Sequence, residues 1–300
     1  MRRVGPAWLD PRSWLAVAVL LGVLAGCRAP TPAPADEAGA KSPTGAITTL
    51  IADLRGNDLA GYARHALPPE VHAGVARAWA EGRTLWPLTV LPLDARVPAM
   101  IDDLASPGAE QRWQDSYRRQ FAGEHVELKS AAVALGLFSV QHLLTEADLG
   151  LDERNHCIQL AKALSEWGAR APLGDAERAR AAIPQLAAAA RRTGLTGANA
   201  FARAGMDPAL QRLAPFFAGA KQVLAGYGLD VDAALAAAEV SLIEQKGDQA
   251  KVRVRYPLAG TVIDATVPMI RLGGHWYPAD AVHHARRIAS DEPPSSAASG

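Results

Sequence analysis

The hydrophobic period of the chain changes near Glu239, and this change constrains the fold more than any other feature. Before it, apolar residues recur at helical spacing, as Ile47 and Leu50 do. After it, apolar residues alternate with charged ones, as Val252 and Val254 do with the lysine and arginines between them. A helix repeats about every 3.6 residues and a strand every two. The sequence therefore predicts an α+β fold, predominantly helical, with a small C-terminal antiparallel sheet of about four strands.

Several helices carry start signals in the sequence. Asp58 is placed to cap a short helix, and Pro69 suits the first turn of the next one, where a missing N–H costs nothing. The Asp207-Pro208 pair predicts the start of another. Helical spacing predicts five more helices, over residues 97–104, 109–121, 126–144, 152–167 and 175–192.

Turn residues divide the C-terminal part into strands. Lys246-Gly247-Asp248 predicts a turn between the first two, and Gly273-Gly274 predicts a hairpin between a third strand over 261–272 and the short run His275-Trp276-Tyr277. Pro268 within the third strand indicates an edge position or a bulge, because proline cannot donate to a ladder.

Composition excludes some classes of protein. The 300 residues carry 31 basic and 31 acidic side chains, and this balance argues against nucleic-acid binding, which depends on clustered lysine and arginine. The apolar fraction of 49% is ample for a core. Of the two cysteines, Cys27 and Cys157, one lies near the N-terminus, and no stabilising disulfide is expected.

The N-terminus has the features of an export signal. Arg2, Arg3 and Arg12 flank an apolar run over 14–24 that is short for a membrane span, and small residues follow it. The segment Leu24-Ala25-Gly26-Cys27 resembles the lipobox of bacterial lipoproteins, in which the cysteine becomes the acylated N-terminus. In that family aspartate after the cysteine favours inner-membrane retention. Arg28 at this position implies the outer membrane, facing the periplasm.

We accordingly divide the chain into five parts. These are a signal peptide (1–26), a lipidated Cys27 with a Pro/Ala-rich tether (27–45), a helical domain (46–230), an antiparallel sheet packed on the helices (231–289) and a disordered tail (290–300). Beyond the leader, no other apolar stretch is expected to span a membrane.

The two ends of the folded part resemble nuclear-transport-factor-like domains. The segments that carry this resemblance are 51–59, which is similar to the first helix of such domains, and 267–277, which is similar to their last hairpin. That family packs helices on a curved sheet around a pocket, and it includes both enzymes and binding modules. The long helical stretch over 97–229 departs from the pattern and implies an insertion or a separate helical domain.

Most candidate chemical groups have a structural explanation. Cys157 lies on the apolar face of its predicted helix and is expected in the core, with His156 pointing aside. His142 and Glu146 are one helical turn apart, but two ligands do not make a metal site, so an exposed pair is expected. The sequence therefore predicts no catalytic residue, no metal and no cofactor.

The last hairpin holds the least easily explained polar group. Asp264, His275, Trp276 and Tyr277 lie on or beside it and would form a candidate pocket if the sheet curves. Alternation places His275 and Tyr277 on one face and Trp276 on the other.

We expect a lipoprotein anchored to the outer membrane that acts as a non-catalytic binding or envelope-accessory module. Its partners would be the membrane, through the lipidated N-terminus, and an envelope protein or small ligand. Two alternatives remain at this point. A periplasmic hydrolase or isomerase requires Asp264 and His275 to meet in a concave site. A structural partner-binding protein requires an exposed apolar patch and no deep pocket.

Overall fold

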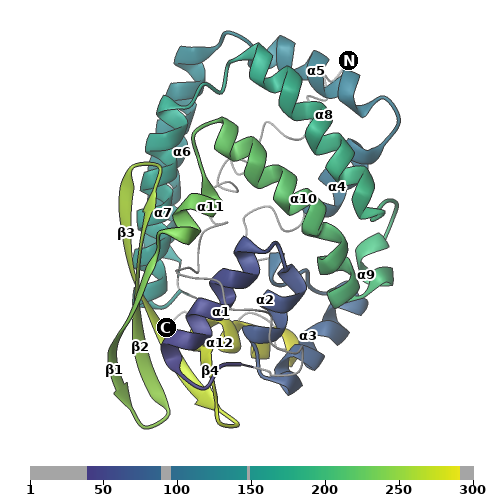
Figure 1. Cartoon of the computed structure of the whole chain (residues 1–300). Coiled ribbons are helices and arrows are strands. Elements are labelled where there is room, and N and C mark those ends of the chain that lie inside the picture. The colour runs from purple at the N-terminus through teal and green to yellow at the C-terminus, as the bar shows by residue number, and fades with distance from the viewer. Residues whose placement is uncertain (1–38, 89–95, 147–148, 291–300) are drawn as a thin grey trace, which may run out of the picture.

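The computed structural model describes residues 39–88, 96–146 and 149–290 (Figure 1). Cys27, the predicted signal peptide and residues 291–300 of the predicted tail lie outside these residues. The helices that occur before the sheet are α1 (Pro43–Arg55), α2 (Leu59–His65), α3 (Pro69–Ala80), α4 (Val97–Ala105), α5 (Ala109–Gln120), α6 (His125–Thr145), α7 (Leu151–Arg170), α8 (Ala176–Thr193), α9 (Ala200–Ala204), α10 (Met206–Gly226) and α11 (Val231–Ala236). The sheet follows, with β1 (Glu239–Lys246), β2 (Gln249–Leu258), β3 (Thr261–Leu272) and β4 (His275–Pro278), and α12 (Ala279–Ala289) ends the described chain.

This arrangement confirms the predicted class, a mostly helical α+β protein with a four-stranded antiparallel sheet. Local start signals explain several helix boundaries. The Asp58 carboxylate accepts a hydrogen bond from the Gly61 N–H at 2.7 Å, and Pro69 occupies the first turn of α3. Helix α1 begins at Pro43 behind a Ser42 cap, three residues before the predicted start of the helical domain.

The sheet is a simple meander in the order β1-β2-β3-β4. Strand β4 pairs only with Met269–Leu272 of β3, so the first half of β3 has no strand on that side. Helix α7 lies there instead. The Gln159 side chain accepts from the Asp264 N–H and donates to the Asp264 carbonyl, both at 2.9 Å. One amide thus satisfies both backbone groups that a neighbouring strand would have paired.

Helices and sheet share their core. One cluster of buried side chains joins residues of α1, α7 and α11 to residues of β2, β3 and β4, and a second joins α2, α3 and α10 to Tyr277 and α12. The Trp79 indole N–H, fully buried in the second cluster, donates to the Phe201 carbonyl at 2.9 Å. Because both clusters include residues on each side of 230, the helical and sheet parts pack as one body. The range 231–289 also contains two helices, α11 and α12, which the periodicity analysis did not predict.

Helices α6 and α7 form an antiparallel pair at the outer edge of the molecule (Figure 1). They approach closely because the residues between them are small. A Cβ added to Gly136 would lie 2.2 Å from the Ser165 Oγ, and one on Gly168 would lie 3.0 Å from the Ala132 Cβ. The Ser165 hydroxyl donates to the Ala132 carbonyl across this contact. Helix α7 packs on β3, and α6 packs extensively on α7 alone among the described elements.

Candidate functional site

The four residues of the candidate pocket do not form one site. Trp276 and Tyr277 are 2% and 1% exposed, and they belong to different core clusters. The Asp264 carboxylate pairs with the Arg253 guanidinium on β2 and lies 3.6 Å from the Arg255 Nε. This pairing lowers the pKa of Asp264. Asp264 is thus part of a charged row on the solvent face of the sheet.

Strand register also separates Asp264 from His275. His275 pairs with Leu272, which lies eight residues beyond Asp264 on the same strand. At about 3.4 Å per residue this is about 27 Å, far beyond hydrogen-bond reach. The structure therefore does not bring together the acid–base pair that the hydrolase alternative requires.

The prediction that Cys157 lies in the core with His156 pointing aside was wrong, because the structure reverses the two. His156 is 8% exposed, and its Nε2 lies 2.7 Å from the Tyr256 hydroxyl, whereas Cys157 is only half-buried. His156 faces the core because it shares a helical row with Leu160 and Trp167. Burial lowers the pKa of His156 to about 4 and raises that of Cys157 to about 11. A neutral imidazole and a protonated thiol fit a structural role rather than a nucleophile and its base.

The predicted pair His142 and Glu146 is an exposed contact, with 3.5 Å between the His142 Nε2 and the Glu146 Oε2. Among the described residues, no group of three or more histidine, cysteine, aspartate or glutamate side chains is arranged to hold a metal ion.

A polar cluster that the sequence did not reveal lies where α7 and α12 begin. The Glu153 Oε1 of α7 lies 3.9 Å from the His284 Nδ1 of α12. Gly150, just before α7, lies next to the Asp280 carboxylate of α12. Burial, and secondarily the Asp280 charge, raises the pKa of Glu153 to about 7. Burial likewise raises the pKa of Asp280. The Glu153 Oε2 is buried without a hydrogen-bond partner. These groups come from segments more than 120 residues apart, so no local spacing could have predicted their meeting.

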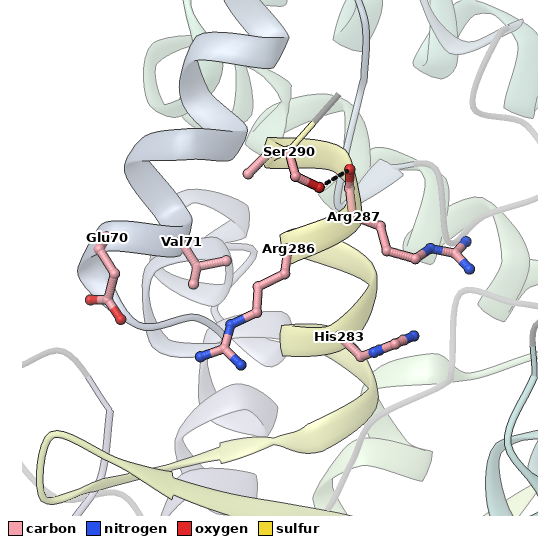
Figure 2. A pocket seen from close by; sticks show the side chains of 7 residues that line it. Glu70, Val71, His283, Arg286, Arg287 and Ser290 are labelled. Atoms are coloured by element: carbon pink, nitrogen blue, oxygen red, sulfur yellow. Dashed lines mark hydrogen bonds between the residues drawn. The ribbon is translucent and has the colours of Figure 1, made fainter. Parts of the chain in front are cut away.

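An open hollow of about 470 Å³ lies between the start of α3 and the end of α12. Figure 2 shows Arg286 and His283 projecting from α12, with Glu70 on the facing helix. The dashed line marks the Ser290 hydroxyl donating to the Arg287 carbonyl. The side chains splay apart instead of converging, and the hollow is open to solvent. It lacks the enclosed apolar lining with a few converging polar groups that small-molecule sites have.

The most distinctive surface of the described residues is on α6. Val126, Val133, Leu137 and Leu144 repeat at intervals of seven, four and seven residues, which places them in one row along the helix. Their exposed fractions are 71%, 52%, 72% and 55%. We call this row the α6 apolar surface. Phe138, also half-exposed, lies to one side of it.

The α6 apolar surface is free of ionised side chains over most of its length. Residues 130–141, between Lys129 and His142, include none. Within the described chain, α6 is the one helix that is long and apolar enough to cross a membrane, judged by length and composition. Only 22% of the residues in its most apolar 18-residue stretch are buried. We expected no second membrane span from the sequence, and α6 has the length and composition of one because neutral Ser, Gly and Gln do not interrupt its apolar run. The absence of ionised side chains from residues 130–141 indicated that this helix is apolar on two faces. Packing on α7 requires only one apolar face.

Comparison with known proteins gives no relative. No family model, no curated protein and no solved structure matches the chain.

Proposed function

We propose that this chain is a lipoprotein anchored to the periplasmic face of the outer membrane, and that it acts as a non-catalytic binding module through the α6 apolar surface. The observation that carries the binding role is that surface, a charge-free row of exposed aliphatic residues. Exposed apolar area on a folded protein is unfavourable in water, and continuous patches of it commonly mark interaction sites.

The anchor is supported by the sequence at Leu24-Ala25-Gly26-Cys27 behind a short apolar run. Acyl chains bind membranes at about 0.8 kcal/mol per buried methylene, and two or more chains make attachment durable. An anchored module needs little affinity of its own to stay at the envelope.

Geometry favours partner binding over the hydrolase alternative. An acid–base enzyme needs converging groups in a concave site, and Asp264 and His275 are on distant parts of β3 and β4. A partner-binding protein needs an exposed apolar patch, which α6 supplies.

The anchor is tested by exchanging each of the two cysteines in turn. Cells producing the full chain are labelled with a palmitate analogue, and the protein is followed by membrane fractionation. We expect Cys27→Ala to abolish labelling and leave the leader uncut, because the acyl acceptor is lost. The matched variant Cys157→Ala should label and fractionate like the parent chain. Labelling that survives Cys27→Ala would refute the anchor.

A further inference from the structure

We propose that the α6 apolar surface lies against the lipid bilayer to which Cys27 is joined, so that the protein contacts the membrane twice, through its acyl chains and along α6. This inference rests on the proposed function and identifies the partner of its binding surface.

The composition of α6 suits lipid on its outer side. The helix is apolar on both faces: small residues, including Ala132 and Gly136, pack on α7, and the valines and leucines of the α6 apolar surface face outward. A helix apolar all round is normally covered on all sides. Here α7 alone packs on it extensively among the described elements. Helices that lie in a membrane interface bury their apolar face at the boundary of headgroups and acyl chains.

The shape and size of the surface fit a second protein poorly. A 21-residue helix is about 31 Å long, so a strip about 10 Å wide offers about 300 Å² per partner. A symmetric pair would bury about 600 Å², half of the roughly 1,200 Å² at the lower end of stable interfaces. The row is a convex ridge of valine and leucine, without the tryptophan, tyrosine or arginine that usually dominate protein interfaces. A bilayer needs no complementary groove.

Chain length keeps α6 within reach of the membrane. Gly39 is the twelfth residue after Cys27, and covalent geometry limits the span between them to about 40 Å. Ala40 accepts a hydrogen bond from the Trp276 N–H, and four residues later Asp280 lies beside Gly150 at the start of α7. These contacts connect Ala40, through β4 and the start of α12, to the start of α7, which follows the end of α6 that carries Leu144. Figure 1 shows α1, β4 and α12 gathered at one end of the molecule, with α6 along its outer edge.

The position of Leu151 supports the same orientation. It lies in the first turn of α7, next to the end of α6, and is 75% exposed. Exposed apolar side chains therefore extend beyond α6 to the start of α7.

Photo-cross-linking distinguishes lipid from protein at this surface. Benzoylphenylalanine replaces Leu137 in one sample and Val262 in another; Val262 is a control on β3 with 57% exposure. Each acylated full chain is reconstituted in phosphatidylcholine vesicles and, separately, irradiated in isolated cell membranes. We expect several-fold more lipid adduct, by mass spectrometry, from position 137 than from position 262. Adding Val133→Glu should lower the adduct at 137, and the matched Val262→Glu should not.

Other outcomes would overturn the proposal. They are equal lipid adduct at both positions, no lipid adduct at 137, or capture at 137 of a second copy or another polypeptide. The mass of the N-terminal peptide in the same samples separates the two proposals. An acylated Cys27 without lipid at 137 refutes only the bilayer contact, whereas an unacylated Cys27 refutes the anchor on which it rests. Circular dichroism of each variant verifies folding, since the altered side chains are exposed.

Discussion

At the scale of single residues, the structure contains buried polar groups whose ionisation opposes folding. Glu153 is the clearest, with a side chain 24% exposed and a pKa raised by burial from 4.5 to about 7. Below about pH 4.5 the carboxyl is protonated in both the folded and the unfolded chain. As pH rises from there to 7, the unfolded chain releases the proton first, so the free energy of unfolding falls.

We predict that Glu153→Gln stabilises the protein at pH 8 by about 1–3 kcal/mol, because the amide removes the buried charge. At pH 4.5 the variant and the parent should differ by less than about 0.5 kcal/mol, since the folded parent is then neutral at this position and its unfolded chain is only half ionised. Urea unfolding at the two pH values measures this. Glu146→Gln, at an exposed carboxylate, is the control and should show no such dependence. A Glu153→Gln variant less stable than the parent at pH 8 would contradict the argument.

At the scale of elements, sequence periodicity predicted much of the fold. Residues 97–104, 109–121 and 175–192 form helices within a few residues of the expected bounds, because their apolar stripes and caps are local signals. Helix α12 was missed although its signals are local: Val282, Ala285 and Ile288 recur every three residues on one face, and Asp280 lies in its acidic first turn. The candidate pocket failed for a different reason. Asp264 is close in sequence to the hairpin of β3 and β4. Strand register, however, pairs His275 with Leu272, eight residues beyond Asp264.

The tight packing of α6 on α7 gives a prediction at this scale. Gly136→Ala adds a methyl 2.2 Å from the Ser165 Oγ, so we expect a loss of about 1–3 kcal/mol from overpacking. Gly226→Ala is the matched change, since nothing lies within 4 Å of a Cβ there. It should be neutral or stabilising by up to about 1 kcal/mol, because alanine favours helix. Thermal unfolding compares the two. A Gly136→Ala variant as stable as Gly226→Ala would show that the close contact between α6 and α7 is not formed.

At the scale of the whole molecule, the two apolar features of the chain belong to one account. The segment ending at Cys27 would attach the protein to the envelope, and the α6 apolar surface would bind there. Neither feature needs the hollow beside Arg286 or the polar cluster around Glu153. The central claim is that α6, which is exposed in the isolated chain, is covered in the cell.

The most direct test is the reactivity of α6 in intact envelopes. Leu137→Cys and Val262→Cys are each introduced into the full chain, and a membrane-impermeant maleimide is applied after the periplasm has been opened. In the isolated chain both sites are exposed, at 72% and 57%, and Cys157 is a slow background common to both. We predict that position 137 reacts several-fold more slowly than position 262 and that urea removes the difference. Equal reaction of the two sites before urea would contradict the account.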